Sequence, residues 1–266
     1  MPRKRPTVAD LLALKGKRQL SMLRVMSLEE AAAAESAGID LISVPPALME
    51  NTEFREAAPT CFTCAGLEPG EFVTTADYLR VAFRMLKATA DSVYCAASLE
   101  TIARMRAEGI PVCGHVGLVP SRRTWTGGFR AVGKTAESAL EVYRQTKLLE
   151  EAGAFAAEIE VVPASVASEI SKRTAMLMIS MGAGAGCDAQ YLFAEDVLGT
   201  NTGHYPRHSK KYRDLAAEYR RLQAERVAAF REYRADVETG RYPGEDHLVG
   251  IDHGELKAFV AGLPAG

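Results

Sequence analysis

The segment FAAEIEVVPASVASEISKRTAMLMISM, residues 155–181, contains two apolar runs separated by a short amphipathic stretch. The runs, Phe155–Val162 and Met176–Met181, have the length and aliphatic content of buried strands. The stretch between them, Ala164–Arg173, carries apolar residues at helical spacing. Two strands joined by such a helix form a βαβ unit, in which the strands lie parallel in one sheet. The segment therefore predicts an α/β fold.

The same alternation extends over residues 19–201 and predicts eight strands. Eight strands favour a closed (β/α)8 TIM barrel, although an open doubly wound sheet shows the same alternation. The expected strands are Leu20–Met26, Asp40–Val44, Thr60–Ala65, Ser92–Ala96, Ile110–Gly114, Phe155–Val162, Met176–Met181 and Asp196–Thr200. The expected helices are Leu28–Ala37, Thr75–Ala88, Leu99–Glu108, Glu137–Ala152, Ala164–Arg173 and Asp188–Ala194.

The C-terminal part of the chain differs in composition from residues 19–201. Residues 210–238 are strongly charged, with apolar residues near one side, and predict one long helix. This helix either packs on the outside of the barrel or forms a contact between subunits. We expect residues 1–266 to form a single barrel domain with this helix as an addition.

Charge and composition point to a small-molecule partner. The net charge of -2 gives no basic footprint for nucleic acid or for an anionic membrane surface. No apolar stretch is long enough to span a bilayer, and the basic start MPRKR is not followed by the apolar region of a secretory signal. The five cysteines are expected to be free thiols in a reducing cytoplasm.

Several motifs occur in the order in which one enzyme family carries them. The longest is IPVCGHVGLVP, residues 110–120. Shorter ones are Thr7–Leu12, Gly127–Phe129, Glu160–Pro163, Gly182–Gly184, Gly203–Pro206 and Tyr242–His247. On these motifs the chain resembles ketopantoate hydroxymethyltransferase.

This resemblance implies a (β/α)8 barrel that assembles into a homo-oligomer, a decamer in the family. It also implies transfer of a one-carbon unit from methylenetetrahydrofolate to 3-methyl-2-oxobutanoate, giving ketopantoate on the route to pantothenate. In the family a divalent metal, commonly Mg2+, binds the 2-oxo acid and polarises its carbonyl. A base can then remove the proton from the adjacent carbon.

Two motif residues are candidates for the site. Glu160 falls on the family's catalytic glutamate, and the resemblance implies that it is the base. Glu158 shares its face because side chains alternate along a strand, so both carboxylates are expected to point into the barrel. His115 also matches the family and is expected to bind substrate. The alternatives are carboxylates paired with basic residues and a structural, hydrogen-bonded histidine.

Three segments depart from the family. Pro45-Pro46-Ala47 replaces Gly-Asp-Ser, Ala65-Gly66-Leu67 replaces Ala-Asp-Leu, and Tyr94-Cys95-Ala96 replaces Lys-Ile-Glu. By position we assign Ala47, Gly66 and Tyr94 to the substrate site. An alternative register pairs Val73–Asp77 with the family's second helix and drops one βα unit. In neither register does an aspartate reappear at the position where the family has one.

The departures weaken the case for a metal, because Mg2+ requires oxygen ligands. We therefore expect no metal-binding residue, although the resemblance implies Mg2+. A Zn2+ site formed by Cys64, Cys95, Cys113 and His115 is an alternative.

The basic loop around Trp125, which contains Arg122, Arg123 and Arg130, either receives an anionic cosubstrate such as folate or is simply solvated.

Three functions are consistent with these residues. The first is a divergent hydroxymethyltransferase or aldolase-type enzyme that acts on a small 2-oxo acid. The second is a metal-independent lyase or hydrolase that acts on a small carboxylate. The third is a catalytically silent paralogue that retains the oligomer surface.

Overall fold

A computed structural model describes residues 4–67 and 70–264. The chain divides into two compact units, residues 1–213 and 214–266. The predicted grouping of 1–266 into one domain stays a prediction. Within the described residues, no helix combines the length and apolar character that crossing a membrane requires.

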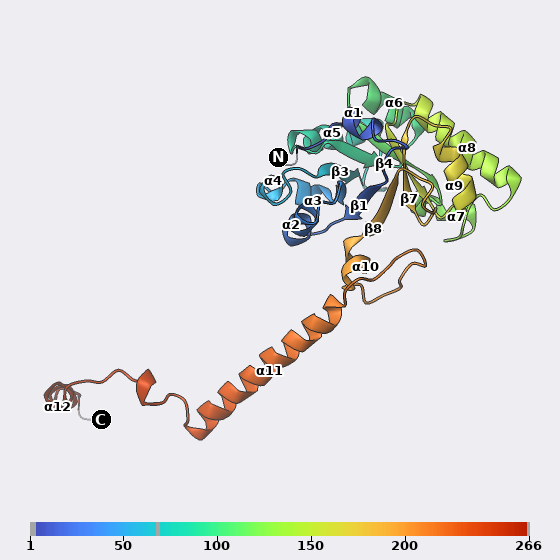
Figure 1. The fold of residues 1–266 in the computed structure, drawn as a ribbon. Coiled ribbons are helices and arrows are strands. Elements are labelled where there is room, and N and C mark those ends of the chain that lie inside the picture. Colours follow the sequence, from blue (N-terminus) through green and yellow to red (C-terminus); the bar gives the residue numbers. More distant parts are fainter. Residues whose placement is uncertain (1–3, 68–69, 265–266) are drawn as a thin grey trace. The chain divides into compact units, whose positions relative to one another are not determined.

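The first unit contains a closed barrel of eight parallel strands, which follow one another around the barrel in chain order (Figure 1). This closure confirms the (β/α)8 prediction and excludes the open doubly wound sheet. The strands are β1 (Leu20–Arg24), β2 (Leu41–Val44), β3 (Phe62–Leu67), β4 (Ser92–Cys95), β5 (Val112–Gly117), β6 (Ala156–Glu160), β7 (Leu177–Met181) and β8 (Ala189–Phe193).

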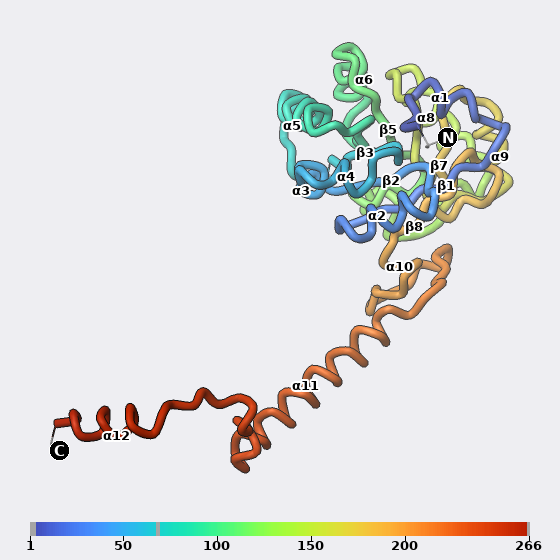
Figure 2. The backbone as a smooth tube through the Cα atoms, turned by 60° about the vertical axis from the view of Figure 1, so that its left-hand side comes forward, coloured from blue at the N-terminus to red at the C-terminus, as the bar shows by residue number. Residues whose placement is uncertain are grey.

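Helices surround the barrel (Figures 1 and 2). Two of them, α2 and α5, begin after capping residues, because the hydroxyls of Ser27 and Thr74 accept hydrogen bonds from backbone N–H groups of the first turn. The helical elements are α1 (Val8–Leu12), α2 (Leu28–Ser36), α3 (Pro46–Met49), α4 (Phe54–Ala57), α5 (Thr75–Lys87), α6 (Leu99–Ala107), η1 (Pro120–Arg122), α7 (Arg123–Thr126), α8 (Ala136–Glu151), α9 (Ala164–Ser171) and α10 (Ala194–Leu198).

The eighth strand lies earlier in the chain than predicted. The predicted strand Asp196–Thr200 and the predicted helix Asp188–Ala194 are both wrong, since β8 covers Ala189–Phe193 and α10 follows it. Ala189 and Tyr191 alternate into the barrel interior, which is strand rather than helix periodicity. Asp196 accepts hydrogen bonds from Asn201 and Ser209 within the following turn.

No helix separates β7 from β8. The connection is the glycine-rich turn after Met181, in which a Cβ on Gly184 would come within 2.5 Å of the Ala164 Cβ. The turn therefore needs glycine for close packing against α9.

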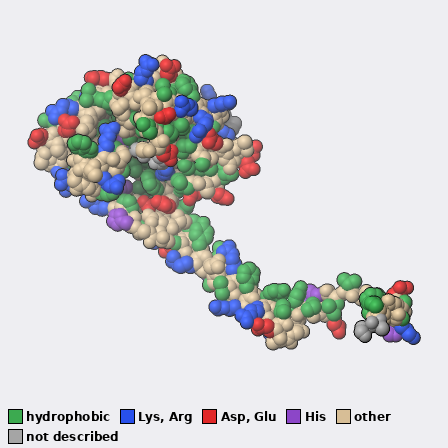
Figure 3. Space-filling view, turned by 180° about the vertical axis from the view of Figure 1, so that it is seen from behind, with side chains coloured by type: hydrophobic (Ala, Val, Ile, Leu, Met, Phe, Trp, Pro, Cys, Tyr) green, Lys and Arg blue, Asp and Glu red, His purple; other side chains and the backbone are tan. Residues whose placement is uncertain are grey.

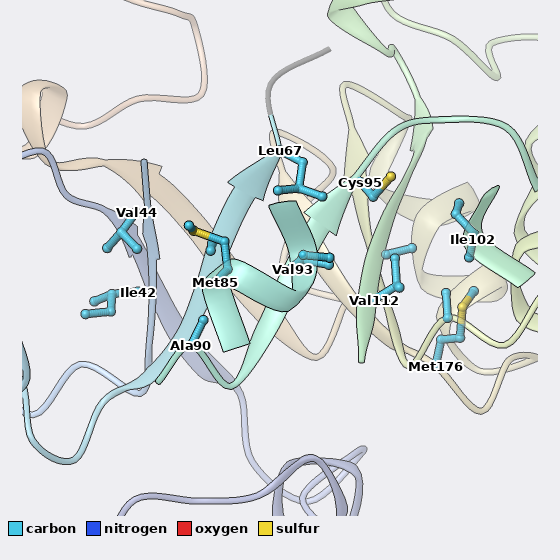
Figure 4. Packing of buried hydrophobic residues seen from close by; sticks show 14 of the residues in the cluster. Ile42, Val44, Leu67, Met85, Ala90, Val93, Cys95, Ile102, Val112 and Met176 are labelled. Atoms are coloured by element: carbon cyan, nitrogen blue, oxygen red, sulfur yellow. The ribbon is translucent and has the colours of Figure 1, made fainter. Parts of the chain in front are cut away.

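Buried apolar residues form two clusters. The outer cluster lies between the strands and the helices and includes Ile42, Val93 and Ile102 (Figure 4). The inner cluster fills the barrel and joins Leu11 of α1 to Leu20 and other residues near the strand starts. Because α1 packs at the end where the strands begin, the space available for a site lies at the other end.

The second unit consists of α11 (Leu215–Thr239), η2 (Glu245–His247) and α12 (His253–Ala261). Its α11 confirms the predicted long helix but begins at Leu215, because the Asp214 carboxylate caps the first turn at Ala217. Neither α11 nor α12 has a buried residue, and apolar side chains lie at the surface of this unit (Figure 3).

Candidate active site

A cavity of about 480 Å³ opens at the end of the barrel where the strands finish. Enzymes with this fold carry their active sites at this end, because the loops that follow the strands converge there. The strand residues with polar side chains that line the cavity are Arg24, Ser43, Tyr94, His115, Glu158, Glu160 and Tyr191.

Strand alternation places these side chains. Glu158 and Glu160 follow Ala156 on the inner face of β6, and Arg24 follows Leu20 and Met22 on the inner face of β1. Arg24 and Glu160 are the last residues of their strands. The polar groups therefore lie near the carboxyl ends of the strands, and the apolar interior lies towards the ends where the strands begin.

His115 lies between the two carboxylates. Its Nδ1 is 3.5 Å from Glu158 Oε2, and its Nε2 is 3.3 Å from Glu160 Oε2. The Tyr94 hydroxyl shares a hydrogen bond of 2.9 Å with the same Nδ1. Nε2 is buried and makes no hydrogen bond of good geometry with the described residues, although the Glu160 carboxylate lies 3.3 Å from it.

Burial has the largest effect on the pKa values of Glu158 and Tyr94. It raises the pKa of Glu158 to about 8, and the nearby Cys64 and Glu160 act in the same direction. His115 and Arg24 oppose this shift by attraction to the carboxylate. Burial and the Glu158 carboxylate also hold the pKa of the Tyr94 phenol far above its ordinary value. At neutral pH, Glu158 is therefore mainly a neutral carboxylic acid beside a neutral phenol.

The residues at the family's metal positions do not fit a magnesium ion. Pro46 lies in α3, Gly66 in β3 and Ala96 just after β4, and none has a side-chain oxygen. In the part of the chain that is described, no three His, Cys, Asp or Glu side chains are arranged to hold a metal ion.

The thiolate alternative also lacks the required geometry. Cys64 and Cys113 lie inside the barrel, whereas Cys95 packs in the outer cluster beneath the helices. A hydrogen bond with Cys64 and burial both raise the pKa of the Cys113 thiol, which disfavours the thiolate that zinc would require.

Three of the five predicted site residues meet in the cavity, namely Glu160, His115 and Tyr94. Gly66 is buried in β3, where it pairs with Tyr94 across the sheet, and Ala47 is exposed in α3. Neither belongs to the described residues that line the cavity. Their assignment to substrate binding stays a prediction.

Sequence reasoning missed several cavity residues. Arg24 is signalled only by a charge that follows the inward-facing Leu20 and Met22 on one strand. Tyr191 was hidden by the wrong placement of β8. His208 approaches Gly182 so closely that a Cβ there would lie 2.8 Å from its Nδ1, a contact with no sequence signature.

The basic loop after β5 contributes Pro120, Ser121 and Arg123 to the cavity. Arg123 lines it, whereas Arg122 donates hydrogen bonds to the carbonyl oxygens of Ala96 and Ala97. Trp125 is 91% exposed. Arg123 is therefore the member of this loop that is placed to meet an anion in the cavity.

A family model described as ketopantoate hydroxymethyltransferase matches residues 48–245. The chain belongs to the ketopantoate hydroxymethyltransferase family. It is 34% identical to a 3-methyl-2-oxobutanoate hydroxymethyltransferase of Nitratidesulfovibrio vulgaris, over 97% of this chain and 89% of that one. It is 35% identical to the enzyme of the same name from Hyperthermus butylicus, over 96% and 94% of the two chains.

Solved structures of other members of the same fold resemble this family member in architecture. A putative phosphonomutase from Burkholderia cenocepacia superposes with a TM-score of 0.54 at 12% identity, covering 86% of this chain and all of that one. A 2,3-dimethylmalate lyase of the PEP mutase/isocitrate lyase superfamily gives 0.51 at 14% identity, over 96% and 99%. At such low identity these similarities show the barrel fold alone.

Proposed function

We propose that the chain transfers a one-carbon unit to a small 2-oxo acid, 3-methyl-2-oxobutanoate, with Glu160 as the base. The observation that carries this proposal is the position of Glu160, at the last residue of β6 and on the wall of the cavity, with only 12% of its side chain exposed. Family membership supplies the reaction class.

The cavity offers groups for each part of such a substrate. Arg24 provides positive charge and His208 a ring nitrogen for hydrogen bonding to the carboxylate, and Met181 with Phe193 provides apolar surface for the branched methyl groups. Glu160 removes the proton from the carbon next to the carbonyl, which leaves an enol that can form the new carbon–carbon bond.

The one-carbon donor is expected to be methylenetetrahydrofolate, which carries carboxylates. Arg123, in the loop that follows β5, is the residue that would hold such an anion at the cavity. We place the enzyme in the cytoplasm as a homo-oligomer, by extension from the family.

The first step can be followed without the donor. The protein is incubated with 3-methyl-2-oxobutanoate in heavy water, with and without Mg2+, and exchange of the C3 proton is followed by NMR. We expect exchange with the wild type and a rate about 10²-fold or more lower for Glu160→Gln, because a positioned base contributes about that much. Glu137→Gln, an exposed site in α8, is the matched control.

Equal rates for Glu160→Gln and the wild type would remove Glu160 as the base. If the wild type exchanges no proton under any condition, the proposed function fails and the catalytically silent paralogue remains. Formation of ketopantoate after addition of methylenetetrahydrofolate separates the transferase from a lyase or hydrolase.

A further inference from the structure

Enolisation of a 2-oxo acid leaves negative charge on the 2-oxo oxygen, and some group must neutralise it. The described residues offer no metal site for this purpose. We propose that Glu158 is the general acid that protonates the 2-oxo oxygen while Glu160 removes the C3 proton, so that the reaction needs no divalent metal. This inference rests on the proposed function and names a second catalytic residue for it.

The position of Glu158 supports this role. It lines the cavity one inward-facing step below Glu160 on β6, and only 5% of the residue is exposed. An acid and a base on one strand, two residues apart, can reach adjacent atoms of one small substrate, since their Cα atoms are roughly 7 Å apart.

The groups around Glu158 come from most of the barrel strands. His115 and Cys113 face it from β5, Tyr94 from β4, Cys64 from β3, Arg24 from β1, Tyr191 from β8 and Glu160 from its own strand. His115 and Arg24 attract the carboxylate, but burial and the acidic neighbours outweigh them and raise the pKa of Glu158. The carboxyl group thus retains a proton at neutral pH, as an acid catalyst must.

Arg24 orients the substrate for this transfer. It lines the cavity, and its charge acts on Glu158, so the two groups are close. The carboxylate of a 2-oxo acid is attached directly to the carbonyl carbon. A carboxylate that binds Arg24 therefore places the 2-oxo oxygen towards Glu158.

The step balances in atoms and charge. The C3–H bond breaks and its proton forms an O–H bond with the Glu160 carboxylate. The electron pair forms the C2=C3 bond, and the carbonyl electrons take the proton from Glu158. The products are a neutral enol, protonated Glu160 and ionised Glu158. When C3 forms its new bond, the enol proton returns to Glu158, and the proton on Glu160 passes to the one-carbon unit or to water, so that both groups are restored.

His115 and Tyr94 act as positioning residues. The imidazole contacts both carboxyl groups, at 3.5 and 3.3 Å, and the Tyr94 hydroxyl holds its Nδ1. The ring therefore keeps the acid and the base apart at a fixed separation and does not need to contact the substrate.

The test compares the full-length wild type, Glu158→Gln and the control Glu137→Gln after removal of metals with EDTA. Exchange of the C3 proton of 3-methyl-2-oxobutanoate is measured by NMR between pH 6 and 9.5, with and without added Mg2+. We expect metal-free exchange by the wild type, with a rate that falls above about pH 8 as Glu158 ionises. Glu158→Gln should be about 10²-fold slower and should lack this fall.

The outcomes separate this inference from the proposed function. Exchange by the wild type only when Mg2+ is present keeps the function and overturns the inference. A Glu158→Gln variant with the rate and pH profile of the wild type also overturns it. No exchange with or without Mg2+ overturns both.

A second measurement uses only the wild-type protein, so it tests the inference even if Glu158→Gln does not fold. In wild-type protein labelled with ¹³C at the glutamate carboxyl carbons, one signal should titrate near pH 8. A spectrum in which every glutamate titrates in the ordinary range would overturn the inference without any variant.

Discussion

Glu158 is a carboxyl group buried in the barrel, and this burial affects the stability of the fold as well as the proposed acid catalysis. In the unfolded chain its pKa is the ordinary 4.5, and in the folded chain it is about 8. The folded state therefore binds the proton more tightly. The contribution of this proton to the stability of the folded state is fully present below about pH 4.5 and is lost as the pH rises through about 8.

This linkage predicts how Glu158→Gln changes the pH dependence of unfolding. Between pH 5 and 8.5 the free energy of unfolding of the wild type should fall relative to the variant by up to about 4 kcal/mol, because one pKa unit corresponds to about 1.4 kcal/mol. Urea titrations at both pH values measure this difference. Glu137→Gln should follow the wild type, and a constant offset between wild type and Glu158→Gln would contradict the prediction.

Individual site residues were predictable where a motif and strand alternation agreed. Glu160 and His115 lie in family-like runs, and each falls on the inner face of its strand. Arg24 could not be found in this way, because its significance depends on closure of the barrel. Closure pairs Arg24 with Phe193, two residues that are far apart in the sequence.

Among the secondary-structure elements, β5 and β6 form the contact that fixes Glu160, the proposed base. Gly117, the last residue of β5, has a φ of +83°, and a Cβ there would lie 2.6 Å from the Glu160 carbonyl oxygen. The neighbouring Leu118 N–H donates a 3.0 Å hydrogen bond to that oxygen. Close backbone approach at Gly117 thus sets the position of Glu160.

We predict that Gly117→Ala lowers both stability and C3 exchange. Gly109→Ala is the matched control, since Gly109 has a φ of +77° but no atom within 4 Å of the added Cβ. Both variants should lose about 1–2 kcal/mol from the left-handed backbone, and Gly117→Ala should lose roughly a further 1–3 kcal/mol. Exchange should fall only in Gly117→Ala. Equal losses in both variants would mean that the contact with Glu160 has no influence.

Element prediction succeeded for β1–β7 and failed at β8 for a physical reason. The first seven strands overlap their predicted ranges, because each is an apolar run bounded by a helix pattern. The chain reaches β8 through a tight glycine turn instead of a helix. The helix expected at Asp188–Ala194 is thus the strand itself, and neighbouring strands rather than local sequence decide its conformation.

At the scale of the whole molecule, the cavity and the exposed apolar side chains of the second unit belong to different parts of the chain. Every described residue that lines the cavity lies between Arg24 and Ser209, within the first unit. The second unit presents exposed apolar side chains, among them Val249 at 99%, Ile251 at 59% and Phe259 at 59%. Apolar surface of this kind is typical of a protein–protein interface.

We therefore predict that residues 214–266 support assembly. Light scattering of the full-length chain should give a mass well above the 28.7 kDa of one subunit. A chain that ends at Arg213 should contain fewer subunits, as calculated from its measured mass, and should keep the circular dichroism of the barrel. The double variant Val249→Ser, Ile251→Ser keeps the length of the segment and tests whether its apolar side chains are responsible. A monomeric full-length chain would contradict the prediction, and an unchanged number of subunits after truncation would place the subunit contacts on the first unit.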